Sequence, residues 1–390
     1  MPLDSPVKVT HIVRQYLPSI GGMEEVVRNI AHHQLRRGQD ATRIITLNRL
    51  FRQSSQQLPA QEWIDGIEVI RLPYAGSSRY PLCPAVFKYL RDADVIHVHG
   101  VDFFYDFLAA TKWLHRRPLL LSTHGGFFHT RFASRAKQAY FHSITRLSAN
   151  AYNQVVATSA NDGDLFGQII SPLKLQVIEN GVDVEKYAGS AAPQLTPTLM
   201  YFGRWSSNKG LLPTLKLFAA LLRQHPEWRL IIAGREYDHS LAELQEVTRV
   251  LGISHAVTLA ANPSDEQIKQ LLAQASYFIC LSDHEGFGIA PIEAMSAGLT
   301  PILSGIPPFQ RLHNESGLGI CIEPSTPIPA VISRLLDLHH QGEAAYQGRV
   351  KAAQGFSSRY AWPQVADRYL ALYEQLRRDQ LPQEQGRSAQ

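Results

Sequence analysis

Cysteine, charge and long apolar runs are all scarce in this sequence. Three cysteines occur among 390 residues, an odd number without metal-ligand spacing, which indicates a reducing compartment. No stretch reaches the roughly 18 consecutive apolar residues that a membrane-spanning helix needs. The first eight residues contain no apolar core of a signal peptide, so we do not expect secretion. The expected location is the cytoplasm.

The charge is small and unevenly distributed. Hydrophobic residues make up 45% of the chain and charged residues 18%, which is typical of a soluble globular protein. The first 180 residues contain 20 Lys and Arg against 14 Asp and Glu, and the others 18 against 20. The basic half is consistent with an anionic membrane surface, an acidic substrate or ordinary solubility. Its candidate membrane contacts are Arg28, Arg36, Arg37, Arg116, Arg117, Arg131, Arg135 and Lys137. Because acidic residues interrupt the basic ones, nucleic acid is not an expected partner.

Strand-like and helix-like segments alternate along the whole chain, which predicts parallel sheets covered by helices. Expected strands cover residues 7–13, 42–47, 67–72, 95–98, 119–122, 155–158, 175–178, 199–203, 230–233, 257–259, 277–281, 300–304 and 319–322. Helical spacing predicts a first helix from Gly21-Gly22 to Gly38 and an amphipathic helix over residues 362–376. The polar residues 54–59 are expected to form a loop, and those after Asp379 to fray.

The length allows two domains of ordinary size. Residues 188–197 contain small side chains, two prolines and no charge, so they are predicted to form a linker between domains. The expected domains are residues 1–185 and 198–355, followed by a C-terminal helix over residues 356–380.

The most informative segment runs from Cys280 to Gly298. An apolar strand is followed by a polar turn with Gly286 and Gly288, and then by a helix that begins near Pro291. A strand, glycine loop and helix in this order point backbone N–H groups and the positive helix end at an anion such as a phosphate. Glu285 on the loop and Glu293 on the helix could accept hydrogen bonds from sugar hydroxyls of the same ligand. Two glutamates eight residues apart on an exposed helix would by themselves mean little.

A second group of charged residues follows the strand over residues 199–203. Arg204 ends that strand, and Lys209 precedes the next helix. Arginine can hold phosphate oxygens with two hydrogen bonds and lysine supplies a point charge, so this pair predicts a diphosphate site. The alternative is a solvated basic turn. A complete Gly-x-Gly-x-x-Gly is missing after the first strand, so a dehydrogenase is not expected.

The N-terminal half offers further polar candidates where strands end. Gly22 lies at the first strand–helix turn, and glycine there would let a ligand approach the backbone closely. His124 and Ser159 follow two later strands, at the carboxyl edge where open sheets bind ligands. A structural hydrogen bond for His124 and helix capping for Ser159 are the alternatives. His97-Val-His99 places two rings on one face of a strand, for metal binding or for hydrogen bonding.

Two Asp-x-Asp triplets could in principle hold a metal. Asp92 and Asp94 precede a strand and are therefore expected at its amino edge, away from the ligand side. Asp162 and Asp164 lie in a polar turn, where helix capping explains them. Neutralisation of a phosphate by Arg204 and Lys209 is the better prediction, so no metal and no cofactor is expected.

These motifs together resemble the family 4 retaining glycosyltransferases over nearly the full length. The matching segments, in order, are Gly21-Gly22, Asp94-Val-Ile-His-Val-His99, Ser122-Thr-His-Gly125, Glu179-Asn-Gly-Val-Asp183, Phe202-Gly-Arg204 with Lys209-Gly210, and the Glu285–Glu293 segment. The opening residues 13–25 are similar to a narrower group, the α-mannosyltransferases that extend lipid-linked cellobiose in acetan- and xanthan-type exopolysaccharide assembly.

The resemblance implies a GT-B architecture, in which two Rossmann-like, doubly wound parallel-sheet domains face each other across a cleft. It implies that the C-terminal domain binds GDP-mannose, that the N-terminal domain binds a polyprenyl-diphosphate-linked oligosaccharide, and that the final helix crosses back to the first domain. The enzyme would then associate peripherally with the inner face of the cytoplasmic membrane. The implied catalytic residues are His124, Glu285, Lys209 and Arg204. The implied donor-binding residues are Gly22, Ser159, Arg204, Lys209, Gly286, Phe287, Gly288, Ile289 and Glu293.

Within this resemblance, Glu293 would bind the ribose and Glu285 would lie beside the donor sugar. No residue must act as a carboxylate nucleophile, so a front-face reaction is favoured, in which the donor phosphate accepts the acceptor proton. Two alternatives remain open. One is a transferase of the same fold that uses a UDP- or ADP-sugar, and the other is a non-catalytic subunit that only binds nucleotide sugars.

Overall fold

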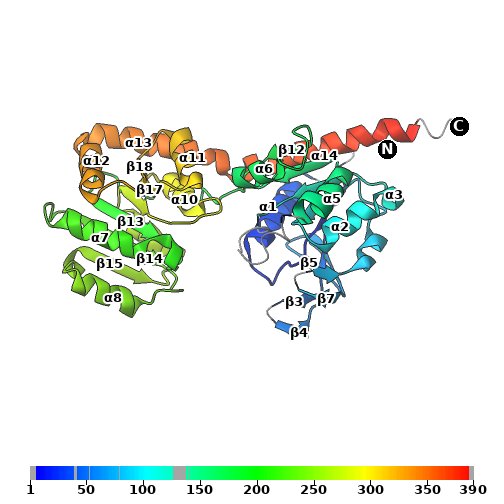
Figure 1. The fold of residues 1–390 in the computed structure, drawn as a ribbon, viewed down its shortest axis with the longest axis horizontal. Helices are drawn as coiled ribbons and strands as arrows, with labels where there is room; N and C mark the ends of the chain where they lie inside the picture. The colour runs from blue at the N-terminus through cyan, green and yellow to red at the C-terminus, as the bar shows by residue number, and fades with distance from the viewer. Residues whose placement is uncertain are drawn as a thin grey trace. The chain divides into compact units, whose positions relative to one another are not determined.

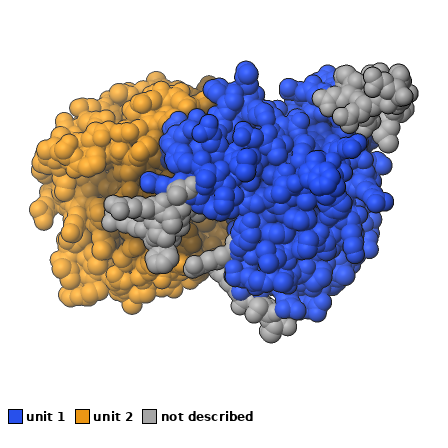
Figure 2. Space-filling model, turned by 45° about the vertical axis from the view of Figure 1, so that its right-hand side comes forward, with its two compact units in different colours: residues 1–181, 362–390 blue, residues 182–361 orange. Residues whose placement is uncertain are grey.

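The computed structural model describes residues 6–38, 42–51, 53–78, 80–125, 138 and 140–385, without the side chains of residues 53–56 and 381–385. The chain forms two compact units, shown in Figure 2. Unit 1 comprises Met1–Gly181 together with Trp362–Gln390, and unit 2 comprises Val182–Ala361. The chain therefore passes between the units twice, at Gly181 and again at Trp362.

Unit 1 is built on an eight-stranded sheet in the order β12-β11-β10-β9-β1-β2-β6-β5, in which only β5 is antiparallel to its neighbour. Figure 1 labels the two edge strands of this sheet, β12 and β5. The strands are β1 (Val9–Ile12), β2 (Arg43–Leu47), β5 (Gln61–Ile64), β6 (Ile67–Leu72), β9 (Val95–His99), β10 (Leu119–Ser122), β11 (Gln154–Ala157) and β12 (Leu175–Val177). Two small antiparallel pairs are formed by β3 (Arg49–Leu50) with β4 (Gln53–Gln57) and by β7 (Ala75–Ser77) with β8 (Tyr80–Leu82).

Helices cover both faces of this sheet because its strands carry apolar side chains on both sides. The helices of unit 1 are α1 (Gly22–Arg36), α2 (Phe103–Ala110), α3 (Lys112–His115), α5 (Arg146–Ala151), α6 (Ala160–Phe166) and α14 (Trp362–Gln385), with single turns at Pro84–Tyr89 and Phe141–Thr145. On one face, Val9, Val95 and Leu120 pack with residues of α1 and α14. On the other, Ile96 and Leu121 pack with residues of α2, α5 and α6.

Unit 2 contains a six-stranded parallel sheet in the order β15-β14-β13-β16-β17-β18. Its strands are β13 (Thr198–Phe202), β14 (Arg229–Gly234), β15 (Val257–Ala261), β16 (Tyr277–Cys280), β17 (Thr300–Ser304) and β18 (Ile320–Ile322). Its helices are α7 (Leu211–Leu222), α8 (Leu241–Val250), α9 (Asp265–Leu272), α10 (Ile289–Ala297), α11 (Pro307–Ser316), α12 (Ile328–His340) and α13 (Gly342–Ser357), with short turns at Ser207–Lys209, Ser254–Ala256 and Ser358–Tyr360. The strand order reverses between β13 and β16, and open sheets of this kind bind ligands outside the carboxyl ends of the strands at the reversal.

Every strand that the sequence predicted is present, with bounds that differ by no more than two residues at either end. The expected loop over residues 54–59 is wrong in part, because β4 occupies Gln53–Gln57 and pairs with β3. The expected fraying after Asp379 is also wrong as far as Gln385, where α14 ends. Of the three cysteines, Cys83 and Cys280 are buried, and Cys321 is half-buried.

The predicted linker over residues 188–197 is part of unit 2. The N–H groups of Gly189 and Ala191 donate to carbonyl oxygens near the end of α10, and that of Ala192 donates to Ala275. A free linker would leave these donors to water, so this segment is fixed by its backbone hydrogen bonds.

Candidate active site

The turn after β13 and the loop after β16 are joined at the strand reversal of unit 2. The N–H of Asp283 donates to the carbonyl oxygen of Asn208 (3.0 Å), and the Asn208 amide donates to the carbonyl oxygen of His284 (2.9 Å). Gly210, at φ +67°, allows this close approach, because a Cβ there would lie 2.0 Å from the carbonyl oxygen of Leu281. The conformation therefore requires glycine on both counts, steric and dihedral.

Lys209 and Glu285 meet across this junction. The Lys209 ammonium lies 2.6 Å from Glu285 Oε1, and the side chains retain 19% and 12% of their exposure. The Ser282 hydroxyl donates to the same carboxylate oxygen (2.7 Å). Both charged groups are thus held in place, and they line one cavity.

Helix α10 begins one residue after Gly288, which has φ +97° and lies against the ring of Phe309. The helix thus starts two residues before Pro291, earlier than the sequence predicted, and ends at Gly298 as expected. The N–H groups of its first turn have no partner within the helix and carry the positive end of its dipole. An anion in front of Ile289 would meet these groups.

Two neighbouring cavities open at the carboxyl ends of the strands of unit 2. The first has a volume of about 300 Å³, and its lining includes Lys209, Glu285, Phe287, Gly288 and Ile289. The second has a volume of about 470 Å³ and lies against the residues that follow β13, β14 and β15. Phe202, Gly203, Arg204 and Glu293 line both. Of the expected donor-binding residues in this unit, Gly286 alone does not line either cavity.

Arg204 and Glu293 have different surroundings although they share these cavities. The Arg204 guanidinium lies over the Tyr237 ring, 4.9 Å from its centroid. Burial raises the pKa of Glu293 to about 7, with Lys186 opposing the shift and Asp183 and Asp265 adding to it. Glu293 therefore takes up a proton at a higher pH than an exposed glutamate does.

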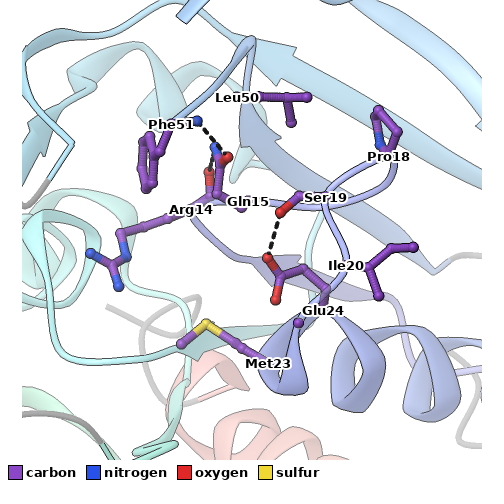
Figure 3. A pocket seen from close by; sticks show the side chains of 10 residues that line it. Arg14, Gln15, Pro18, Ser19, Ile20, Met23, Glu24, Leu50 and Phe51 are labelled. Atoms are coloured by element: carbon purple, nitrogen blue, oxygen red, sulfur yellow. Dashed lines mark hydrogen bonds between the residues drawn. The ribbon is translucent and has the colours of Figure 1, made fainter. Parts of the chain in front are cut away.

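Another cavity, of about 590 Å³, lies in unit 1 outside the ends of β1 and β3 (Figure 3). Its lining includes Arg14, Ser19, Glu24 and Phe51. The Ser19 hydroxyl donates to Glu24 Oε1 (2.9 Å), as Figure 3 shows. A carboxylate, a hydroxyl, a guanidinium and an aromatic face suit a polyhydroxylated ligand. Gly21 lines this cavity but the predicted Gly22 does not, and a Cβ on Gly22 would meet no atom within 4 Å.

The turn that contains His124 and the start of α6 at Ser159 meet at Asp162. The N–H of Gly125, next to His124, donates to Asp162 Oδ2 (2.8 Å). The Ser159 hydroxyl accepts from the N–H of Asp162 (3.1 Å) and caps α6. The structure thus shows the capping role for Ser159 that the sequence gave as an alternative. The capping role that the sequence gave to Asp162 is wrong, because Ser159 is the cap and Asp162 accepts from the turn at His124.

The residues 20–186 match the family profile described as Glycosyltransferase Family 4, and residues 185–348 match that of Glycosyl transferases group 1. The chain is 52% identical over 367 residues to the GDP-mannose:cellobiosyl-diphosphopolyprenol alpha-mannosyltransferase of Xanthomonas campestris, covering 94% of this chain and 96% of that protein. This chain is a family 4 glycosyltransferase. A protein of the same name from Komagataeibacter xylinus is 39% identical, over 97% of this chain and 96% of its own length.

The fold agrees with this membership. A glycosyltransferase from Rickettsia africae superimposes with a TM-score of 0.70, covering 95% of this chain and 98% of that chain, although only 18% of the residues are identical. The predicted fold class, with two parallel-sheet α/β domains, is therefore confirmed.

The aspartates of the two Asp-x-Asp triplets of this glycosyltransferase lie in different surroundings. Asp94 accepts from the N–H of Lys8 (2.9 Å), and Asp92 lies 3.2 Å from Arg43. Both precede β9, at the amino end that the sequence predicted. Asp162 is buried and accepts the hydrogen bonds described above, whereas Asp164 is exposed.

Sequence reasoning missed a third histidine that lies beside His97 and His99 of β9. His11, on β1, joins His97 and His99, and the ligand atoms of the three lie within 4.8 Å of one another. The rings of His97 and His99 are tilted by 36° to each other, with centroids 3.9 Å apart. Each of the six ring nitrogens already has a hydrogen-bond partner. Parallel pairing of β1 with β9, which places His11 beside His97, could have been inferred only with the strand order known.

Sequence reasoning also missed the polar side chains of the larger cavity of unit 2. Lys186 lies 2.8 Å from Asp265, and the Tyr187 hydroxyl donates to the same carboxylate oxygen (3.0 Å). Their position in the sequence could have pointed to them, because Lys186 and Tyr187 closely follow the Glu179–Asp183 motif.

Proposed function

We propose that this glycosyltransferase transfers mannose from GDP-mannose to a cellobiose linked to polyprenyl diphosphate, with retention of the anomeric configuration. The 52% identity over nearly the full length to a protein named for this reaction carries the proposal. The smaller cavity of unit 2 supports the proposal. It is lined by the four charged residues that the family resemblance implies, which are Arg204, Lys209, Glu285 and Glu293.

We assign the smaller cavity of unit 2 to the sugar and the diphosphate. Arg204, Lys209 and the first turn of α10 offer the positive groups that a diphosphate needs. Glu285, which contacts Lys209, would lie beside the mannose. Glu293, which lines both cavities, would accept a hydrogen bond from the ribose, and the larger cavity would then hold the base.

The proposed reaction breaks the bond between the anomeric carbon and the diphosphate oxygen, which leaves with the electron pair. The acceptor hydroxyl oxygen forms the new bond on the same face, and its proton passes to an oxygen of the departing diphosphate. The cations stabilise the negative charge that grows on the leaving group, and such preorganised contacts are worth about 2.7–4 kcal/mol each. His124 would contact a sugar hydroxyl. In this proposal, neither the cleavage of the donor bond nor the transfer of the acceptor proton uses a metal or another cofactor.

We propose the acceptor-binding role for unit 1 and assign the acceptor sugars to the cavity of Figure 3. Its guanidinium, hydroxyl and carboxylate groups could bond to sugar hydroxyls, and its apolar side chains could pack against the faces of sugar rings. The polyprenyl chain would remain in the membrane, which requires that this unit touch the bilayer.

A surface of unit 1 has the composition needed for that contact. Trp113, Leu114, Leu147 and Leu173 are exposed, as are the cations Arg116 and Arg146. The ammonium groups of Lys112 and Lys174 both bond to residues 150–153, which places α3, the end of α5 and Leu173 side by side. We call these residues the α3–α5 surface. Apolar side chains among cations bind the interface of an anionic bilayer.

Most of the basic residues that the sequence suggested for this contact are engaged elsewhere or not described. Arg28 and Arg37 form ion pairs with Asp65 and Asp367, at 3.1 Å and 2.9 Å. Arg131, Arg135 and Lys137 lie outside the described residues. None of the described helices has the length and apolar character of a membrane-spanning segment.

The test of the function is a donor and acceptor screen on the purified chain. GDP-mannose, UDP-glucose and ADP-glucose would each be offered with polyprenyl-diphosphate-linked cellobiose, and the products separated by chromatography. We expect mannosylated lipid from GDP-mannose alone. Transfer from a UDP- or ADP-sugar instead would assign the protein to the alternative donor class, and donor binding without turnover would make it a non-catalytic subunit.

A further inference from the structure

The backbone at His124 has a conformation that residues with a Cβ rarely adopt. His124 has φ +54° in the turn after β10, a left-handed value that is unfavourable for a residue other than glycine. Such strain persists only where the surroundings fix it, and it clusters at functional positions. The contacts of the residues on both sides of His124 should therefore show what holds this conformation.

Asp162 binds both neighbours of His124. Its Oδ2 accepts from the Thr123 hydroxyl (2.7 Å) and from the Gly125 N–H (2.8 Å). The Thr158 hydroxyl lies 3.3 Å from the same oxygen, and Asp162 is itself buried in the first turn of α6. A buried carboxylate oxygen that holds the residues before and after His124 fixes the turn between them.

The His124 ring is the end of a chain of imidazoles under α1 and α14. His124 Nε2 lies 3.0 Å from His99 Nδ1, His99 Nε2 lies 3.0 Å from His11 Nδ1, and His11 Nε2 lies 2.7 Å from Gln34 Oε1. Burial lowers the pKa of all three histidines, that of His11 to about 4, so the rings are neutral at physiological pH. A neutral imidazole carries one N–H, and each ring must therefore donate on one side and accept on the other.

The group at one end of such a chain determines which nitrogen of each ring carries the hydrogen. Because the Gln34 carbonyl oxygen accepts, His11 donates from Nε2 and accepts at Nδ1. His99 then donates from Nε2 to His11, and His124 donates from Nε2 to His99. This order leaves a lone pair on Nδ1 of His124, the ring nitrogen that the chain does not use.

We propose that Asp162, His99, His11 and Gln34 are positioning residues of the transferase, which hold His124 in one backbone conformation and one tautomer so that its Nδ1 accepts a hydrogen bond from a sugar hydroxyl. This inference rests on the proposed contact of His124 with the substrate. Asp162 fixes where the ring is, and the imidazole chain fixes which nitrogen can accept. Asp162, His99, His11 and Gln34 are buried, and they would act on the substrate through His124.

His97 provides a matched control for the chain. It lies on the same strand as His99, is buried as completely, and packs against it with ring centroids 3.9 Å apart. Its ring nitrogens, however, contact the Tyr373 hydroxyl (2.7 Å) and the Ser122 hydroxyl (2.8 Å) and do not reach His124. Replacement of either histidine by leucine removes a buried ring, but only His99→Leu interrupts the chain.

The experiment compares wild type, His99→Leu, His97→Leu and His124→Ala by steady-state kinetics and by nitrogen NMR of protein labelled in its histidine side chains. In wild type we expect the Nε2-protonated tautomer at His124, and in His99→Leu a mixture of both tautomers. We expect His99→Leu to lower kcat about 100-fold, the cost of a misplaced group, with donor KM little changed. We expect His97→Leu to keep both the tautomer and kcat even if its thermal stability falls. In His99→Gln, the amide oxygen can accept from His124 Nε2, so part of kcat should return.

The possible results distinguish a failure of this inference from a failure of the proposed transferase activity. An Nδ1-protonated His124 in wild type, or equal losses of kcat in His99→Leu and His97→Leu, would overturn the inference while the transferase activity stands. Normal kcat in His124→Ala would overturn the substrate contact of His124 and the inference with it. The tautomer is measured without turnover, so it tests the imidazole chain even if GDP-mannose is not the donor.

Discussion

The ammonium of Lys209 lies 2.6 Å from the carboxylate of Glu285, although the two residues are 76 positions apart in the sequence. Each belongs to a different loop at the point where the strand order of unit 2 reverses. The pair holds a cation and an anion in one cavity before any donor is bound. A diphosphate would compete with Glu285 for the lysine, and Glu285 would then be available to a sugar hydroxyl.

Lys209→Ala should therefore lower kcat/KM for GDP-mannose by about 10²–10³, because it removes one cation from the leaving group. Lys216→Ala, on the exposed side of α7, is the matched control and should behave like wild type. Both variants would be assayed with saturating acceptor after a check of folding by circular dichroism. A Lys209→Ala enzyme with nearly normal kcat/KM would show that the diphosphate lies elsewhere.

Glu285 and Glu293 should differ in their kinetic effects. Loss of Glu285 is expected to lower kcat, because the mannose changes its charge in the transition state. Loss of Glu293 is expected to raise donor KM with a smaller change in kcat, because the ribose contact is the same in both states. Donor titrations of Glu285→Gln and Glu293→Gln would measure this. The reverse pattern would mean that the two carboxylates contact the opposite parts of the donor.

Donor binding should improve as pH rises through about 7, where burial places the pKa of Glu293. Below this pH Glu293 is protonated in the free enzyme, and an ionised carboxylate is the stronger acceptor for a ribose hydroxyl. The same raised pKa means that its contribution to stability falls as pH rises from about 4.5 to about 7. Donor KM would be measured between about pH 6 and about pH 8, and the dependence should disappear in Glu293→Gln. An unchanged slope in that variant would assign the titration to another group.

EDTA should leave mannosyl transfer intact, because Arg204, Lys209 and the first turn of α10 supply the positive charge at the diphosphate. The measurement is the initial rate after dialysis against EDTA, with and without added magnesium or manganese. Complete loss that either metal restores would contradict the metal-free mechanism.

Trp113→Ala combined with Leu147→Ala should weaken binding to vesicles that contain anionic lipid. Both side chains belong to the α3–α5 surface and are exposed, at 72% and 73%. Trp63→Ala is the matched control, since Trp63 lies on β5 of the same unit and is 69% exposed. Flotation would compare vesicles with and without anionic lipid at low and high salt, because salt screens the contribution of Arg116 and Arg146. Equal flotation with both lipids, or an equal loss in the Trp63 variant, would remove this surface as the docking site.

The sequence alone was sufficient for the local features of this protein. Buried parallel strands are short apolar runs, so their number and positions could be read directly, and glycines marked where α10 ends. Arg204, Lys209 and the Glu285–Glu293 segment could be singled out as site candidates because each lies where a strand is followed by a glycine-containing turn and a helix, which is typical of phosphate sites. Polar strands such as β4 and the antiparallel edge strand β5 were missed, since their hydrophobic pattern is weak and only pairing with a neighbour forms them.

Contacts between distant segments were decided by the tertiary structure. Nothing in the spacing of His11, His99 and His124 predicts a hydrogen-bonded chain, because it depends on β1 and β10 lying on either side of β9. Asp162 resembled a helix cap or a metal ligand in the sequence, and it became the support of His124 only when α6 was folded against the turn after β10. Strand order and helix packing place such groups within 3 Å of one another, and neither is encoded in the spacing of residues along the chain.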